Sequence, residues 1–450
     1  MLKVGLEIHG YLNTNEKLFC RCKVLHGKKH SESNVNICPV CTGQPGSKPL
    51  LPNTEAVKKV IEIAIILGCR ISPEGLWQRK HYSWPDLPKG FQSTISGPHS
   101  VPSGTGGKFM GIRIKECHLE EDPAAWNPIT GEVDYNRSGA PLVEIVTEPD
   151  FKTSEEVVSW LGNLMSTLSY VSAIDKKSGL KADVNVSITG GERVEIKNIN
   201  SFRKIKEAID LEFTRQEKNP PKIEETRTYD EEKKMTVLMR TKDSAMDYRF
   251  ISEPDLPVLK ISQVLINEIK KSIPKLPFEK MKKLVTKYKI EKRYAEILTK
   301  RLSLVELFEE LVKKVKPEIA IPWVSVELLG VANYNKMDVD EIDINPEHFT
   351  KLLLAVESGK ISELKAKDIL RGWAKGSSPP EKEIEEGKKI ELKEIDKIAK
   401  EVIKENEKAV KDYKAGQKNS LNFLIGEIMK KSGKRAGFKE TREALLGILG

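Results

Sequence analysis

Several segments of the first 260 residues alternate between apolar and polar positions. Three of them have this period of two: 4–12, 110–115 and 182–188. Successive side chains of a strand point to opposite faces, so each segment can bury one face and leave the other polar. Helical segments are interspersed in the same region, notably 53–67 and 154–169. The pattern predicts an α+β fold with mostly antiparallel strands for residues 1–260.

From about residue 261 the apolar residues recur at helical spacing instead. The segment 293–315 is typical, because its leucines and isoleucines stand three or four residues apart. A Gly-Ser-Ser-Pro-Pro sequence at 376–380 marks a break, and the segment from about 394 predicts three short helices. The domains predicted from these changes are 1–260, an all-α helical domain at 261–390, and a small three-helix tail at 391–450.

The distribution of positive charge along the chain predicts a polyanionic partner. The chain of 450 residues has a formal net charge of +9. Residues 260–316 contain sixteen Lys or Arg against seven Glu, which equals the surplus of the whole chain. Such a segment attracts a phosphate backbone. The alternative is the lysine-rich and glutamate-rich surface of a protein from a hot environment. No apolar run approaches 18 residues, so we expect a cytoplasmic protein without a membrane span.

Four of the six cysteines are clustered. Cys20, Cys22, Cys38 and Cys41 form two close pairs separated by fifteen residues. Two pairs of thiolates at this spacing suit a tetrahedral zinc ion, and four protein ligands leave no open position, so the zinc would be structural. His26 and His30 are substitute ligands. The alternative is four reduced thiols without metal.

Residues 116–150 form an acidic segment in this basic chain. Nine of them are Asp or Glu, and Arg137 is the single Lys or Arg. Carboxylates held close together repel one another unless a cation lies among them, and Mg²⁺ binds through carboxylates, water and phosphate oxygens. A solvated acidic surface is the usual alternative. It fits poorly here, because the acids alternate with apolar residues such as Leu142 and Val143 that favour burial.

Two short motifs place acids beside imidazoles. Glu7 and His9 share one face of the first predicted strand, where they could bind metal or transfer protons. The alternative is an ordinary surface pair. In the sequence HLEED at 118–122, Glu120 and Glu121 point to opposite faces, and periodicity alone does not select between them. Glu144 lies in a strand-like apolar run, where an unpaired carboxylate would be costly.

Several ordered blocks of the chain resemble the B subunit of the aspartyl/glutamyl-tRNA(Asn/Gln) amidotransferases in its archaeal form. The blocks extend over nearly the whole chain: VGLEIH at 4–9, RKHYSWPDLPKGFQ at 79–92, HLEED at 118–122, DYNRSGAPLVEIVTEPD at 134–150, KADVNVSI at 181–188, EIKNINSF at 195–202, EETRTYDE at 224–231 and MRTKDSAMDYRFISEPDLP at 239–257. The resemblance implies a large cradle-shaped domain, a helical domain and a tRNA-binding helical tail, in that order.

The resemblance also implies roles for individual residues. It places Glu7, His9, Glu121 and Glu144 around a catalytic Mg²⁺. It makes Lys80 a further catalytic residue. Four basic residues in the matching blocks are candidates for binding ATP: Arg137, Lys197, Arg240 and Arg249. Each of these is more often a surface or salt-bridge group when taken alone. The glycine-rich loop at 103–108 lacks the spacing of a phosphate-binding loop, so the expectation of ATP rests on the resemblance.

The implied activity is the ATP-dependent amidation of Glu-tRNA(Gln), Asp-tRNA(Asn) or both through a phosphorylated acyl intermediate. Such an enzyme is a carbon–nitrogen ligase with glutamine as its nitrogen donor. An amidase (A) subunit would supply the ammonia and a small C subunit would complete the complex, since this chain has no Gly-x-Ser-x-Gly sequence. One alternative is the archaeal paralogue specific for Glu-tRNA(Gln), which has an inserted domain that this chain has no room for. Another is a non-catalytic tRNA-binding scaffold.

Overall fold

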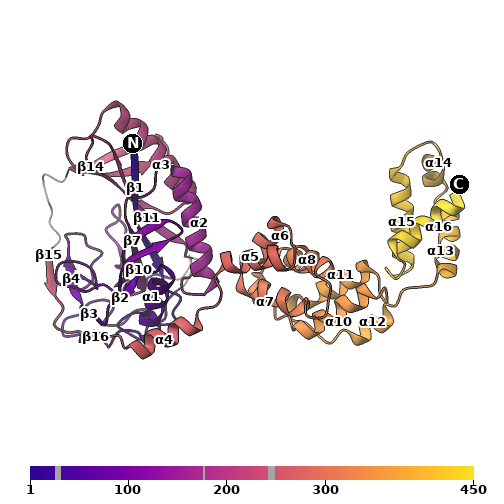
Figure 1. Ribbon diagram of the computed structural model, residues 1–450, viewed down its shortest axis with the longest axis horizontal. Helices are drawn as coiled ribbons and strands as arrows, with labels where there is room; N and C mark the ends of the chain where they lie inside the picture. The colour runs from indigo at the N-terminus through magenta and orange to yellow at the C-terminus, as the bar shows by residue number, and fades with distance from the viewer. Residues whose placement is uncertain (26–31, 176–177, 242–248, 450) are drawn as a thin grey trace. The chain divides into compact units, whose positions relative to one another are not determined.

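The chain divides into two compact units, Met1–Leu276 and Pro277–Gly450 (Figure 1). This computed structural model describes residues 1–25, 32–175, 178–241 and 249–449. The first unit is built on one large mixed sheet with helices, and the second is helical. The predicted α+β fold class is therefore confirmed. Among the described residues, no helix is long and apolar enough to cross a membrane.

The sheet of the first unit contains twelve strands among the described residues. Ten of them follow one path of neighbours: β14 (Met235–Thr241), β13 (Glu225–Asp230), β12 (Val194–Ile199), β11 (Leu180–Ile188), β1 (Leu2–Tyr11), β10 (Pro141–Thr147), β7 (Ile112–Glu121), β5 (Gln92–Thr94), β4 (Gln78–His81) and β15 (Arg249–Ser252). Two more lie off this path: β2 (Arg70–Ile71) and β6 (Gly104–Phe109). The pairing of β12 with β13 is parallel, and the other pairs are antiparallel. Two separate ladders join β16 (Leu259–Lys260) to β3 (Glu74–Gly75) and β8 (Ala125–Trp126) to β9 (Val133–Asp134).

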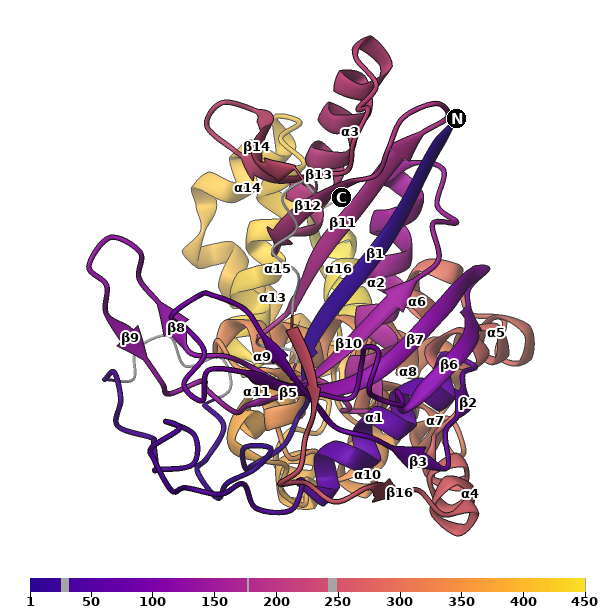
Figure 2. The same cartoon turned by 90° about the vertical axis from the view of Figure 1, so that its left-hand side faces the viewer.

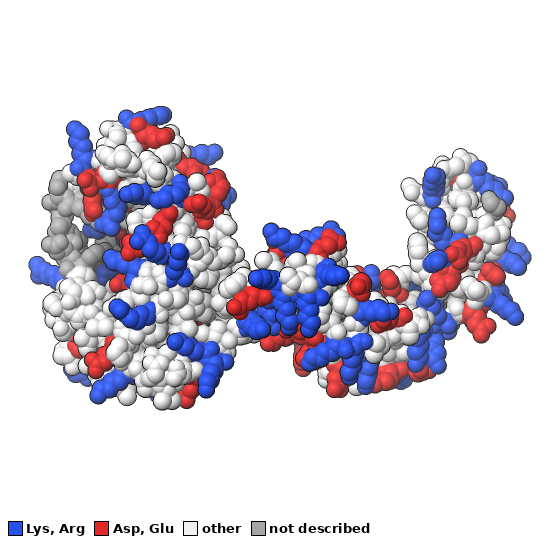
Figure 3. Space-filling view, viewed as in Figure 1, with Lys and Arg blue, Asp and Glu red and all other residues white. Residues whose placement is uncertain are grey.

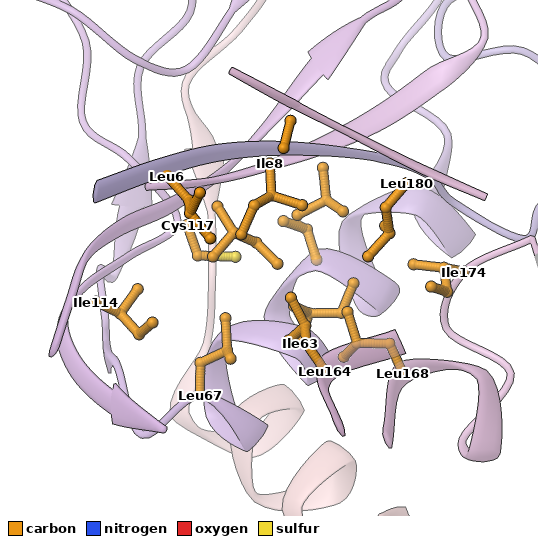
Figure 4. Packing of buried hydrophobic residues seen from close by; sticks show 14 of the residues in the cluster. Leu6, Ile8, Ile63, Leu67, Ile114, Cys117, Leu164, Leu168, Ile174 and Leu180 are labelled. Carbon is orange, nitrogen blue, oxygen red and sulfur yellow. The ribbon is translucent and has the colours of Figure 1, made fainter. Parts of the chain in front are cut away.

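One face of the sheet is apolar and covered by helices. The helices are α1 (Thr54–Ile66), α2 (Ser154–Tyr170) and α3 (Phe202–Lys218). Leu6 and Ile8 of β1 are buried with Ile63 of α1 and Leu164 of α2 in one core (Figure 4). Because side chains alternate along a strand, this packing directs Glu7 and His9 to the other face. Figure 2 shows β1 in the middle of the sheet, between β11 and β10.

The sheet must be strongly curved. Thr241 ends β14 at one edge, and Arg249 begins β15 at the other. A chain spans at most about 3.5 Å per residue, so these two residues lie within roughly 28 Å of each other. The edges of a flat ten-stranded sheet would be about 43 Å apart at a spacing of about 4.8 Å per strand. In Figure 1 the edge strands lie to the left of β1 and helices α2 and α3 lie to its right, so the polar face is concave.

The first unit extends beyond the boundary predicted from sequence. Helix α4 (Gln263–Ser272) belongs to it, because Ile266 and Ile269 are buried in the same core as the sheet. The predicted helical domain begins at residue 261 and would include this helix. Alternation and helical spacing reveal the type of an element, but they do not show on which core a helix packs.

The second unit begins with a run of short helices. They are α5 (Pro277–Lys287), α6 (Lys292–Leu298), α7 (Leu302–Leu311), α8 (Pro317–Pro322), a π-helical segment at Trp323–Leu328, α9 (Leu329–Tyr334), α10 (Pro346–Glu357), α11 (Glu363–Gly372) and α12 (Glu381–Glu386). Four further helices follow: α13 (Leu392–Glu405), α14 (Glu407–Lys414), α15 (Asn419–Lys431) and α16 (Phe438–Leu449). The sequence predicted three helices here, and the segment forms four around a small core of its own.

A buried ion pair fixes α3 to the β13–β14 hairpin. The carboxylate of Glu212 is fully buried and accepts hydrogen bonds from Arg215 at 2.7 Å and from the Thr236 hydroxyl at 2.6 Å. Arg227 of β13 lies 3.8 Å from the same carboxylate. Removing one partner of such a network leaves buried charge uncompensated.

We therefore predict that Glu212→Ala lowers the unfolding free energy of the first unit by about 3–5 kcal/mol. The change should appear in calorimetry as a lower melting temperature for that unit. The matched control is Glu217→Ala, which removes an exposed glutamate from the same helix and should change stability by less than about 0.5 kcal/mol. Equal effects of the two substitutions would contradict this account.

Candidate functional site

A histidine and two glutamates meet at the centre of the concave face. Strand register sets His9 of β1 opposite Glu144 of β10, and Glu144 opposite His118 of β7. The Nε2 atom of His9 lies 3.4 Å from Glu120 Oε1 and 3.6 Å from Glu144 Oε2. His9, Glu120 and Glu144 are named the His9 set below. Their three ligand atoms lie within 4.8 Å of one another, close enough to bind a single ion.

The His9 set is largely shielded from solvent, with side-chain exposures of 28% for His9, 3% for Glu120 and 12% for Glu144. Burial alone would raise the pKa of Glu144, but His118, 3.0 Å away, and His9 hold it well below its usual range. Burial alone would lower the pKa of His9, but Glu144 and Glu120 hold it well above its usual range. The buried carboxylates therefore require positive charge, which a divalent cation can supply in place of the imidazole protons.

A second group of carboxylates lies beside the first. Glu7, Asp183 and Glu195, named the Glu7 set, come from β1, β11 and β12 and also have ligand atoms within 4.8 Å of one another. Lys197 is already among them, with Nζ 2.7 Å from Asp183 and 2.5 Å from Glu195. Burial, Glu144 and Glu195 raise the pKa of Glu7, whereas Lys197 lowers it. Lys197 is thus the resident counter-charge of the Glu7 set.

Glu121 does not join His9 and Glu144, contrary to the sequence-based expectation. Its carboxylate makes an ion pair with Lys89 and accepts a hydrogen bond from the Ser93 backbone N–H at 2.9 Å. Its neighbour Glu120 faces His9 instead. The geometry of β7 explains why Glu120 rather than Glu121 faces His9. His118 of β7 faces Glu144, and because side chains alternate along a strand, Glu120 shares that face and Glu121 points to the opposite one.

The basic residues named from sequence are spread over the sheet. Arg137 lies beyond one end of β1, with Nε 3.2 Å from Asp122, which also accepts a hydrogen bond from Tyr11 at 2.5 Å. Lys181 of β11 stands opposite His9 in the register. These two cations border the His9 set. Lys197 lies in the Glu7 set on the other side.

Three other basic residues stand further from the centre. Lys80 lies on β4, opposite Gln92 of β5. Arg240 is on β14 and Arg249 on β15, at opposite edges of the sheet path. The structure therefore does not group Arg240 and Arg249 with Arg137 around the His9 set.

The four clustered cysteines meet in space. Their sulfur atoms all lie within 4.8 Å of one another, and those of Cys38 and Cys41 are 3.8 Å apart. Four sulfurs around zinc at about 2.3 Å lie about 3.8 Å from one another in a tetrahedron. A hydrogen bond with Cys20 lowers the pKa of Cys41 to about 4, and Lys17 contributes to the shift, although burial opposes it. The group can hold a metal ion. His26 and His30 lie outside the described residues.

The buried Lys17 side chain contacts the cysteine group and donates a hydrogen bond to it. Its ammonium group donates to Cys41 Sγ at 3.4 Å and to the carbonyl oxygens of Asn36 and Tyr135 at 3.1 and 3.3 Å. Four thiolates around a divalent metal have a net charge of −2, which a buried ammonium offsets in part. Tyr135 precedes Arg137 by two residues, so Lys17 also ties the cysteine loop to the segment that holds Arg137.

Sequence reasoning left Glu120 undecided against Glu121 and missed several other residues of the site. The alternation of β7 indicated Glu120 and His118, because the two residues stand two positions apart and therefore point to the same face of the sheet, the face on which His9 lies. Asp183 could have been found in the same way, since it alternates with buried residues of β11. The sequence pattern did not indicate Lys17 or Lys89, because a lysine next to loop residues is normally predicted to lie on the surface.

Comparison with known proteins extends over nearly the whole chain. Residues 2–267 match the family model of the GatB/GatE catalytic domain, and residues 306–449 match that of the GatB domain. The B subunit of the aspartyl/glutamyl-tRNA(Asn/Gln) amidotransferase of Methanocaldococcus jannaschii is 40% identical over 464 aligned residues, which cover 99% of this chain and 97% of that protein. The protein of the same name from Methanothermobacter thermautotrophicus is 39% identical and covers 99% of both chains. That from Methanopyrus kandleri is 40% identical, over 99% of this chain and 98% of that one. The resemblance found in the sequence is confirmed, and the chain belongs to the family of amidotransferase B subunits.

Proposed function

We propose that this chain amidates the side-chain carboxylate of a misacylated tRNA, Glu-tRNA(Gln), Asp-tRNA(Asn) or both, at the expense of ATP. The observation that supports this most is the His9 set, two buried carboxylates and an imidazole within reach of one ion, bordered by Arg137 and Lys181 on a concave face. The relatives above are named as tRNA amidotransferase subunits. A cation pocket beside positively charged side chains suits phosphate chemistry.

The chemistry requires activation of the carboxylate. Ammonia attacking a carboxylate directly would have to expel oxide, which is too poor a leaving group. In the proposed first step a carboxylate oxygen attacks the γ-phosphorus of ATP, the bond to the β-phosphate oxygen breaks, and ADP leaves. In the second step ammonia forms the carbon–nitrogen bond, the carbon–oxygen bond breaks, and phosphate leaves with a proton from the nitrogen. The product is the amide.

The residues of the concave face have distinct proposed roles. His9, Glu120 and Glu144 would hold Mg²⁺, which when bound neutralises phosphate charge and orients the oxygens of ATP. Arg137 would contact phosphate oxygens, because Asp122 and the Pro123 carbonyl fix its Nε at 3.2 and 3.0 Å. Lys181, opposite His9, would add a second cation.

The remaining candidates act around this centre. Glu7 belongs to a set already compensated by Lys197, so it would tune the charge beside Mg²⁺. Lys80 shares the Glu120 side of the sheet, because Gln78 pairs with Thr94 and Thr94 with Glu120. It would neutralise charge on the transferred phosphoryl group. Arg240 and Arg249, at the edges of the sheet, are better placed to meet the RNA than the nucleotide.

Ammonia and RNA would come from partners. The word subunit in the relatives' names supports a complex in which an amidase (A) subunit hydrolyses glutamine and a small C subunit completes the assembly. The RNA contacts would lie in the second unit. Figure 3 shows Lys and Arg side chains crowded around α5 and α6, and twelve of the sixteen Lys or Arg of residues 260–316 lie in this unit. Sequence-independent attraction to a phosphate backbone follows from such a surface. The segment 391–450 is proposed as a tRNA-binding tail.

The proposal is tested by amidation with the complete complex. We expect the chain, purified with its amidase partner, to convert Glu-tRNA(Gln) or Asp-tRNA(Asn) to the amide when ATP and glutamine are present. Glu144→Gln should lower kcat by about 100-fold or more, since it removes a ligand of the proposed Mg²⁺, whose positive charge would stabilise the transition state. Glutamine hydrolysis by the partner should persist.

The matched control is Glu132→Gln, an exposed acid from the same acidic segment, which should leave kcat unchanged. Tight binding of tRNA without amidation by the wild-type complex would instead favour a non-catalytic scaffold. Equal loss of activity in both variants would contradict the assignment of the site.

We propose that the four clustered cysteines hold a structural zinc ion, and we expect the purified chain to contain a single zinc. Cys38→Ser should lose the zinc and lower the melting temperature of the first unit, because the metal closes a loop that contacts Lys17. Cys69→Ser is the control, since Cys69 lies outside the group and should leave the zinc content unchanged. Full stability without bound zinc would contradict the proposal.

A further inference from the structure

Two segments that lie far apart in the sequence are joined by asparagine side chains. One is the cysteine loop, defined here as residues 32–41, which contains Cys38 and Cys41. The other is the arginine segment, defined as residues 133–139, which contains Arg137. An asparagine side chain both donates and accepts, so it can bond to the backbone of a neighbouring segment as a strand does.

Asn34 makes this contact from the cysteine loop. Its side-chain amide donates to the carbonyl oxygen of Val133 at 3.1 Å, and its Oδ1 atom accepts from the N–H of Tyr135 at 2.8 Å. Its own N–H donates to Asp134 Oδ1 at 3.1 Å. The φ angle of Asn34 is +60°, a left-handed conformation that asparagine adopts more readily than most residues. Its hydrogen-bonding groups are therefore aimed at three successive residues of the arginine segment.

Asn136 makes the reciprocal contact from the arginine segment. Its side chain is buried, and its Oδ1 atom accepts from the N–H of Asn36 at 2.9 Å. Its amide group donates to the carbonyl oxygen of Glu32 at 2.8 Å. Both functions of the Asn136 side chain are thus bonded to the backbone of the cysteine loop.

These contacts surround the backbone of Arg137. The hydroxyl of Ser138 donates to the carbonyl oxygen of Cys41 at 2.8 Å, so both sequence neighbours of Arg137 are bonded to the cysteine loop. The guanidinium group is held separately, with Nε 3.2 Å from Asp122 and 3.0 Å from the Pro123 carbonyl oxygen. The position of the Arg137 backbone therefore depends on a loop that is remote from it in the sequence.

We propose that Asn34 and Asn136 are positioning residues for Arg137, because they fix the arginine segment to the cysteine loop. This inference rests on the proposed function, which gives Arg137 the contact with phosphate oxygens. The cysteine group holds the loop itself, since the Cys38 N–H donates to Cys41 Sγ at 3.2 Å. A displacement of about 1 Å in a group that orients a substrate can cost about 100-fold in rate. The cysteine loop thus serves the reaction without touching the substrate.

The structural part of the test removes the Asn34 side chain. Residue 34 is exposed, and Asn34→Gly suits the test because glycine adopts a positive φ without strain. Hydrogen–deuterium exchange of the full chain should be about tenfold faster in residues 135–139, in line with the loss of a backbone partner. Exchange in β1 and β10 should not change, because their ladders do not involve Asn34.

The matched control is Asn127→Ala. The Asn127 side chain accepts hydrogen bonds from the N–H groups of Ile129 and Thr130, within the turn between β8 and β9. Its removal should leave the exchange of residues 135–139 and the kinetics of the complex unchanged.

Kinetics separates positioning from a general loss of stability. In the complete complex, Asn34→Gly should lower kcat/KM for ATP about tenfold or more. The KM for tRNA and glutamine hydrolysis by the partner should not change. A double-mutant cycle with Arg137→Ala makes the direct comparison. Asn34→Gly should lower kcat/KM by less than about twofold in the Arg137→Ala background, because the group that it positions is already gone.

The outcomes separate this inference from the proposed function. Unchanged exchange of residues 135–139 in Asn34→Gly would overturn the inference whether or not the complex amidates tRNA. If the wild-type complex amidates tRNA and the losses in the cycle multiply, the inference is wrong while the activity stands. If exchange rises in Asn34→Gly and the wild-type complex does not amidate tRNA, the connection between the two segments stands and the proposed reaction fails.

Discussion

The register of β1 between β10 and β11 is the constraint on which the rest of the first unit depends. It sets His9 opposite Glu144 and Glu7 opposite Asp183, while Leu6 and Ile8 are buried beneath them. A shift by one residue would place the acids in the core and the apolar residues on the concave face. The hydrophobic packing against α1 and α2 therefore also fixes the positions of the charged groups.

Those charged groups are held together against their mutual repulsion, and each group has a different source of compensation. In the Glu7 set it is Lys197, in contact with two carboxylates. For Glu121 it is Lys89. In the His9 set it is the imidazole of His9 together with that of the adjacent His118, whose positive charge depends on protons. In this third case a bound cation can replace the protons without removing a side chain, which is why we propose the His9 set as the metal position.

Alternation along the chain predicted the fold class and the strands that contain Glu7 and Glu144, and residue spacing predicted the cysteine group. Alternation did not predict the partners of those strands, because the pairing of β1 with β10 and β11 joins residues more than a hundred positions apart. It also left Glu120 and Glu121 undecided, and the resemblance selected Glu121. In the structure Glu120 faces His9, because the hydrogen bond between His118 and Glu144 fixes the face that β7 turns towards Glu144. The fourth helix of the tail and the place of α4 depended on tertiary packing that the local pattern does not contain.

Binding of Mn²⁺ as a paramagnetic substitute for Mg²⁺ tests the central claim most directly. Electron paramagnetic resonance can count the tightly bound ions of the full chain and of the variants Glu120→Gln and Glu121→Gln. This account predicts that Glu120→Gln loses the tight site and that Glu121→Gln keeps it. Loss of the site in Glu121→Gln, with Glu120→Gln unaffected, would contradict the assignment of the metal to His9, Glu120 and Glu144.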